Sequence, residues 1–178
     1  MVLAHDTEAS LLAAVELVNS GEDPDTLLTI DQADAWYARH RYTVRRDRTD
    51  AELTDLRAIR PVLRELLTAD RDTAAEMVNR MLADARAMPR LVRHDDIDWH
   101  IHAVSPDEPL VRRVLVETAM AMADVVRGDE MSRLAVCADD TCAGIVLDLT
   151  RNRSRRFCST ACTNRAAASA YRERQRNG

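Results

Sequence analysis

The sequence contains no lysine, so all 25 of its basic residues are arginine, which we attribute to a GC-rich genome. It is also poor in aromatic residues, at 3 %, and has only four glycines and five prolines in 178 residues. So few turn-forming residues argue against a turn-rich β-sandwich and favour a helix-rich fold. The core of such a fold must consist of Leu, Val, Ala, Met and Ile.

Long apolar runs are absent as well. No stretch approaches the roughly 18–20 consecutive apolar residues of a membrane span, and the first twenty residues lack the basic segment of a signal peptide. We therefore expect a cytoplasmic protein without membrane association, in which thiols stay reduced. Glycine-rich phosphate loops, nucleophile elbows and His-Glu metalloprotease motifs are also missing, so we expect no enzymatic activity.

Charge is distributed unevenly along the chain. From Arg151 onward there are eight arginines and one acid, a net charge of +7, whereas the first 150 residues carry −12. Such asymmetry predicts an acidic body followed by a basic segment that meets a polyanion.

Helical periodicity dominates the acidic part. It predicts a first helix over about 8–19 and a short second helix from a capping box at Thr29 to near His40. A longer helix repeats the capping signature at Thr49 and Glu52, and Pro61 should kink or divide it. Asp72 is the predicted cap of the next helix. Alternation over about 90–104 predicts a β-hairpin. A strongly apolar helix over 110–127 follows and stops at Gly128. We predict a helical domain over 1–128.

The basic end has a different pattern. We expect strands over 134–137, 145–149 and around 155–157, then a helix that Ser159 caps and that runs toward Gln175. The predicted fold is therefore mostly α with a β-hairpin. A small treble-clef-like module over 131–178, with its own hairpin and helix, completes the chain.

All four cysteines lie within 26 residues of this module, as Cys137, Cys142, Cys158 and Cys162. One pair flanks a tight loop, and the other lies at the start of the last helix, where the helix dipole favours thiolates. Four thiolates in a compact hairpin-and-helix arrangement predict a tetrahedral Zn²⁺ site. Because four protein ligands would leave no coordination position for water, the metal should be structural rather than catalytic. Redox or Fe–S chemistry, disulfides and free thiols are the alternatives.

The arginines of the module are candidates for nucleic-acid contact. One group surrounds the predicted hairpin turn, and another forms a stripe on the last helix with Ser169; together with Asn164 the candidates are Arg151, Arg153, Arg155, Arg156, Arg165, Arg172 and Arg176. Arginine can hold phosphates and pair bidentately with guanine, so double-stranded DNA is the expected partner. The alternative is that these arginines, Arg165 above all, neutralise and brace a zinc site with a formal charge of about −2.

The block FCSTACTNRAAASAYRERQR resembles the C-terminal signature of CGNR-type zinc fingers, with Thr163 in place of the glycine. The preceding region, with the phrases VELVNS and PRLVRH, resembles the helical ABATE-type domain that accompanies this finger in bacterial proteins. The resemblance implies a stress-related, DNA-binding transcription regulator.

Two further groups of residues raise the question of a second site. His94, His100 and His102, with Asp95, Asp96 and Asp98 nearby, could hold a metal or a ligand, or simply lie on a hairpin surface. Trp36, Tyr37 and Tyr42 could line a small-molecule pocket or anchor a short helix. We therefore expect a two-part regulator, in which the helical domain senses a signal or dimerises and the C-terminal module binds DNA. A protein-interaction adaptor and a small-molecule-binding protein are the other functional hypotheses.

Overall fold

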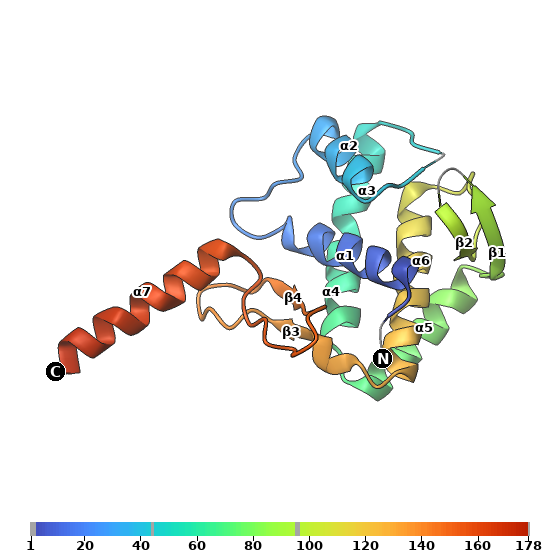
Figure 1. Ribbon diagram of the computed structural model, residues 1–178. Coiled ribbons are helices and arrows are strands. Elements are labelled where there is room, and N and C mark those ends of the chain that lie inside the picture. The colour runs from blue at the N-terminus through green and yellow to red at the C-terminus, as the bar shows by residue number, and fades with distance from the viewer. Residues whose placement is uncertain (1–2, 44, 95–96, 178) are drawn as a thin grey trace.

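A computed structural model describes residues 3–43, 45–94 and 97–177 (Figure 1). The N-terminal region consists of α1 (His5–Asn19), α2 (Ile30–Arg39), α3 (Asp50–Ala58), α4 (Arg60–Thr68), α5 (Arg71–Asp84) and α6 (Leu110–Arg127), with an antiparallel hairpin of β1 (Arg90–His94) and β2 (Ile97–His102) between α5 and α6. A 3-10 turn (Met131–Arg133), a second antiparallel hairpin of β3 (Leu134–Val136) and β4 (Ile145–Leu147), and α7 (Thr160–Asn177) complete the chain. The predicted fold class is confirmed.

Local sequence signals account for most of the element boundaries. Thr29 and Gln32 form a reciprocal capping box at the start of α2, and Gly128 follows the last residue of α6. Pro61 lies in the first turn of α4, where its missing N–H is tolerated, and it divides the long apolar pattern into α3 and α4. The Ser159 hydroxyl accepts a hydrogen bond from the Cys162 N–H and caps α7 as predicted.

Three details of the sequence prediction were wrong. Asp70, not Asp72, caps α5, because its carboxylate accepts from the N–H groups of residues 72 and 73. Thr49 caps α3, but the Glu52 carboxylate accepts from the backbone of Asp47 and Arg48 and so completes no capping box. Residues 155–157 form no strand; only a single backbone bond, from the Ala138 N–H to the Arg156 carbonyl, joins them to the hairpin.

The helical core is organised around α1, which packs between α4 and α6, while α5 covers another side of α6 (Figure 1). Its centre consists of fully buried aliphatic side chains that include Leu11, Leu17, Leu63, Leu66, Leu110 and Met122. Burial of such side chains stabilises each helix through its apolar face rather than through propensity. No helix in the described part of the chain is long and apolar enough to span a bilayer.

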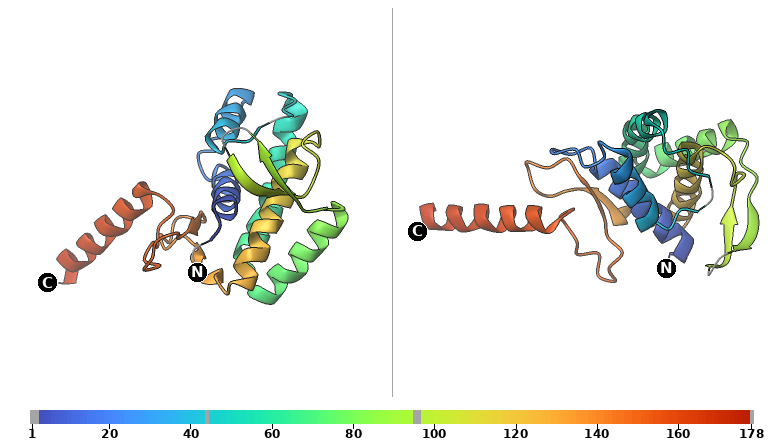
Figure 2. Two further views of the ribbon diagram at one scale, coloured as in Figure 1. Left: turned by 45° about the vertical axis from the view of Figure 1, so that its right-hand side comes forward. Right: turned by 90° about the horizontal axis from the view of Figure 1, so that it is seen from above.

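Strand β4 belongs to two cores at once. Its three residues are all buried. Ile145 and Leu147 join the helical core, whereas Val146 packs in a small separate cluster with the cysteines. The alternation of side chains along a strand therefore fixes the second hairpin between the helical body and the cysteines. Helix α7 extends away from the body in both views of Figure 2.

A single amide holds β4 against the end of α1. The Asn19 side chain donates to the Ile145 carbonyl at 2.8 Å and accepts from the Ile145 N–H at 2.6 Å. These two bonds provide partners for the backbone N–H and carbonyl of Ile145, which lie on the edge of β4 that β3 does not cover. Asn19 thus links two segments that lie 126 residues apart in sequence.

Replacing Asn19 with alanine should leave the Ile145 N–H and carbonyl without these partners. We expect the free energy of unfolding to fall by about 1–3 kcal/mol, measured by chemical denaturation followed by circular dichroism. The matched control is Asn152→Ala, at an exposed asparagine that bonds no described residue, and it should change stability by less than about 0.5 kcal/mol. Equal effects of the two substitutions would contradict the role given to Asn19.

Candidate metal centre and basic helix

The four cysteines converge at the junction of the second hairpin and α7. Cys137 follows β3, Cys142 lies in the loop beyond it, Cys158 precedes α7, and Cys162 lies in the first turn of that helix. Their four sulfur atoms all lie within 4.8 Å of one another. The Cys158 Sγ is 3.5 Å from that of Cys142 and 3.6 Å from that of Cys162.

Backbone turns on both sides bring the sulfurs together. In the knuckle loop, residues 138–143, the Asp139 carboxylate accepts from the N–H and the hydroxyl of Thr141. The Asp139 carbonyl accepts from the Cys142 N–H at 2.8 Å, which closes the turn. The loop is thereby folded by its own short polar side chains, as is typical of Asp and Thr in turns.

The spacing and the donor chemistry fit a tetrahedral zinc ion. Zn–S bonds of about 2.3 Å place the sulfurs about 3.8 Å apart, close to the separations observed. Several donors also point at the sulfurs, as they would at thiolates: the Gly144 N–H at Cys142, the Cys158 N–H at Cys137, and the Ser159 hydroxyl at Cys162.

Without a cation, burial opposes the ionisation of two of the four thiols. Burial raises the pKa of Cys142 and drives that of Cys158 far above its ordinary range, the neighbouring thiols adding to the latter shift. The Ser159 hydroxyl lowers the pKa of Cys162. A divalent cation would remove this conflict, since it binds the deprotonated sulfurs directly.

Gly144 is a site residue that the sequence analysis missed. A Cβ atom there would lie 2.9 Å from the Cys158 Sγ and 3.3 Å from the Cys142 Sγ. The chain can therefore pass this close to the sulfurs only without a side chain. The sequence signal that could have identified Gly144 is its position two residues after Cys142.

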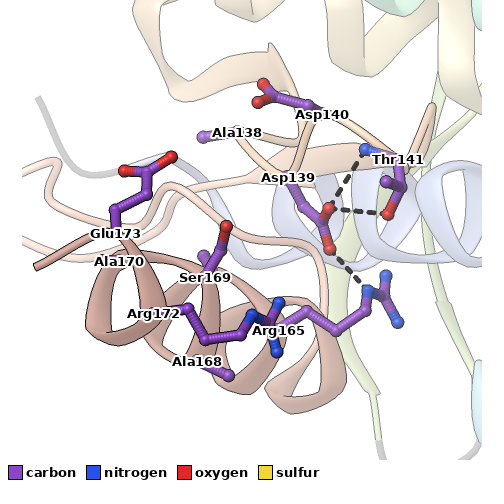
Figure 3. A pocket seen from close by; sticks show the side chains of 11 residues that line it. Ala138, Asp139, Asp140, Thr141, Arg165, Ala168, Ser169, Ala170, Arg172 and Glu173 are labelled. Carbon is purple, nitrogen blue, oxygen red and sulfur yellow. Dashed lines mark hydrogen bonds and ion pairs between the residues drawn. The ribbon is translucent and has the colours of Figure 1, made fainter. Parts of the chain in front are cut away.

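Arg165 braces the knuckle loop. Its Nε donates to the Asp139 carboxylate at 2.8 Å (Figure 3). One of its terminal nitrogens lies 3.1 Å from the Cys162 Sγ. Hydrogen bonds from Thr141 and from Arg165 lower the pKa of the Asp139 carboxyl, so the pair is ionised at neutral pH. The bracing alternative for this residue therefore has direct geometric support.

Two more of the candidate arginines have partners within the protein. Arg155 donates to the carbonyl oxygens of Phe157 and Cys158 at 3.2 and 3.0 Å, which fixes the segment that leads into α7. Arg153 reaches back to the buried carboxylate of Glu130 at 2.6 Å and to the Ser132 hydroxyl. Both guanidinium groups act as clamps on the module.

The side chains of the remaining candidates are exposed and have no hydrogen bond or ion pair to the part of the chain that the structure describes: Arg151, Arg156, Asn164, Arg172 and Arg176. The structure therefore divides the predicted contact residues into a braced set and an unpaired set.

A separate cavity of about 350 Å³ lies on the helical body, between the start of α1, the segment after α2, β2 and α6. Tyr42 lines it, whereas Trp36 is buried and packs against Tyr42 at 5.1 Å between ring centroids. Of the predicted aromatic set, only Tyr42 therefore reaches this cavity; Tyr37 packs beside it at 5.8 Å.

The histidine group lies on the same cavity wall. The Nε2 atoms of His100 and His102 are 2.9 Å apart, and the Nδ1 of His100 contacts the Asp98 carbonyl oxygen. Asp95, Asp96 and the side chain of His94 lie outside the described residues. Among the described side chains, the four cysteines are the only group of three or more potential ligands close enough to share a metal.

Glu117 of α6 is the most perturbed carboxyl of this cavity. Burial raises its pKa to about 7, although Arg113 and a hydrogen bond from the Tyr42 hydroxyl partly oppose the shift. Arg113 itself is buried and donates to the carbonyl oxygens of Thr43 and Arg45.

The close approach at Gly144 can be tested by Gly144→Ala. The added methyl group must displace the Cys158 and Cys142 sulfurs, so we expect zinc affinity to fall at least tenfold, as is typical when the surroundings of metal ligands are disturbed. Competition with a chromogenic chelator measures this affinity. The control is Gly128→Ala, at φ −78°, an angle ordinary for alanine. An unchanged zinc affinity in Gly144→Ala would show that the sulfurs are held differently.

Glu117 should make stability depend on pH. Between its ordinary pKa of 4.5 and about 7, the folded state keeps a proton that the unfolded state has lost, so stability falls as pH rises through this range. Glu117→Gln should remove that fall and gain on the order of 1–3 kcal/mol over the wild type at pH 8. Unfolding curves between about pH 5.5 and 8 measure it. Glu65→Gln, at an exposed position of α4, should follow the wild-type profile; if Glu117→Gln follows it too, the Glu117 carboxyl is not responsible.

Comparison with known proteins agrees with this geometry. Residues 12–129 match the ABATE family, described as a putative stress-induced transcription regulator, and residues 133–175 match the CGNR zinc finger. No curated protein matches the chain. Both descriptions are of regulatory or metal-binding families rather than of enzymes. The ABATE match spans more than half of the sequence, so the chain belongs to the ABATE family and ends in a CGNR zinc finger.

Proposed function

We propose that this protein is a transcription regulator that binds double-stranded DNA through its C-terminal finger, with one Zn²⁺ bound by Cys137, Cys142, Cys158 and Cys162. The observation that carries the proposal is the position of the four sulfurs, within 4.8 Å of one another at the root of a basic helix. Helix α7 leaves this cluster and extends away from the acidic body (Figure 1).

The zinc ion has a structural role in this proposal. All four ligands come from the protein, so no coordination position is left for a water or a substrate. The metal joins the knuckle loop to the first turn of α7 and sets the angle between hairpin and helix. Since the module buries few apolar side chains of its own, metal binding supplies much of its stability.

Electrostatics favours DNA as the partner. The segment from Arg151 onward has a net charge of +7 and the rest of the chain −12. The phosphate backbone attracts the basic end and repels the body, which limits non-specific adhesion to the finger. The unpaired guanidinium groups of Arg151 and Arg156 are available to phosphates without breaking an internal contact.

The helical part, residues 1–128, is the proposed sensing unit, and the finger, residues 131–178, the proposed DNA-binding unit. Helix α1 joins the two functions physically. Ala9 and Ala13 on this helix line the cavity that Tyr42 and Glu117 also line, and Asn19 at its end holds β4. A ligand that shifts α1 would therefore act on the finger through Asn19. Dimerisation through the helical part is a compatible arrangement.

Zinc and DNA binding can be tested together on the intact chain. We expect one zinc ion per chain and duplex binding that weakens steeply between about 50 and 200 mM salt, measured by fluorescence anisotropy with a genomic duplex. The Cys158→Ser variant should not retain the zinc ion. Its affinity for the duplex should fall at least tenfold, because no metal then holds α7. Ser154→Ala, which removes an exposed hydroxyl that contacts none of the four sulfurs, is the control and should retain zinc.

Two results would overturn the proposal. Absence of duplex binding by the zinc-loaded wild type would exclude the DNA-binding role and favour a protein-interaction adaptor. Full zinc content in Cys158→Ser would exclude this cysteine as a ligand.

A further inference from the structure

Helix α7 has two unlike faces, and the rest of the protein covers little of either. Cys162 is its one fully buried residue among residues 160–176, and Ala166 and Ala170 are half-buried. The other side chains in this range are exposed. Most of the surface of this 18-residue helix is therefore open to a partner.

The inner face is turned toward the knuckle loop. A groove of about 420 Å³ separates loop residues 138–141 from α7, and Arg165, Ser169 and Arg172 line it from the helix side (Figure 3). Asp139 and Asp140 line the other wall, and Glu173 adds a third carboxylate. Arg165 and Arg172, two arginines of the stripe that sequence spacing singled out, thus lie beside acids.

The outer face is found from the helical repeat. Tyr171 follows the buried Cys162 by nine residues, which is about two and a half turns, so it lies on the opposite side of the helix. Asn164, Ala167 and Arg174 share its side at spacings of seven, four and three residues. All four are exposed, and none of them lines the groove. The Gln175 side chain contacts the Tyr171 hydroxyl at 3.4 Å along this face.

We propose that α7 meets duplex DNA with this outer face, formed by Asn164, Ala167, Tyr171 and Arg174, and that Arg165 and Arg172 face the knuckle loop instead. This inference rests on the proposed DNA-binding function and names its contact surface. Arg174 was no candidate in the sequence analysis, whereas Arg172 was.

The chemistry of the two faces supports the assignment. An asparagine amide pairs with adenine, an arginine fork pairs with guanine, and alanine packs against the thymine methyl group. A tyrosine hydroxyl can position the helix on a phosphate. On the inner face, Arg165 is already bonded to Asp139, and the exposed Asp140 carboxylate would repel a phosphate backbone that approached the groove.

A matched pair of substitutions on the same helix tests the assignment. Arg174→Gln and Arg172→Gln remove the same charge from exposed positions two residues apart, so long-range attraction falls equally. We expect Arg174→Gln to lower the affinity of the intact, zinc-loaded protein for a mixed-sequence duplex about tenfold and to reduce the salt slope by about one. Arg172→Gln should lower it less than threefold, measured in the same anisotropy titration. Tyr171→Ala should lower the duplex affinity as well, as Arg174→Gln does.

The outcomes separate the two proposals. If the wild type binds the duplex but Arg172→Gln weakens binding as much as Arg174→Gln or more, the outer-face assignment is wrong and the DNA-binding proposal stands. If the zinc-loaded wild type binds no duplex, both fail. Zinc content and unfolding temperature should match the wild type in all three variants, because none of these side chains is a cysteine or bonds one.

Discussion

The arrangement of the molecule depends on the double burial of β4. Because Ile145 and Leu147 belong to the helical core while Val146 packs with the cysteines, the strand cannot leave either side without exposing apolar surface. Asn19 adds two hydrogen bonds to the same strand from the end of α1. The cysteine cluster is therefore built onto the helical body, and the position of α7 follows from the cluster.

The arginines of the C-terminal segment show how a uniform run of charge becomes a differentiated surface. Buried or half-buried acids take up some of them: Asp139 binds Arg165 and Glu130 binds Arg153. Such pairs fix loop geometry, and they leave those guanidinium groups unavailable to a partner without the loss of an internal contact. The arginines whose side chains have no such pair can meet a partner without this loss. The net charge of the segment thus predicts that a polyanion is attracted to it, but not which arginines make the contact.

Signals that act within a few residues could be predicted from the sequence. The capping box at Thr29, the division at Pro61 and the cap at Ser159 all depend on neighbouring backbone groups, and the confined cysteines converge as their spacing indicates. The rest depends on tertiary partners that no local pattern contains. The bonds of Asn19 and the close passage of Gly144 require segments distant in sequence, and the orientation of α7 follows from which of its residues is buried. Asp70 and Asp72 lie too close together for spacing to decide which one caps α5.

In the proposed arrangement, the four cysteines together hold one metal ion at the root of α7. X-ray absorption at the zinc edge of the intact protein tests it most directly, since it reports the type, number and distance of the atoms bound to the metal. We expect a single shell of four sulfur atoms at about 2.3 Å. A shell that contains nitrogen or oxygen, or fewer than four sulfurs, would contradict it.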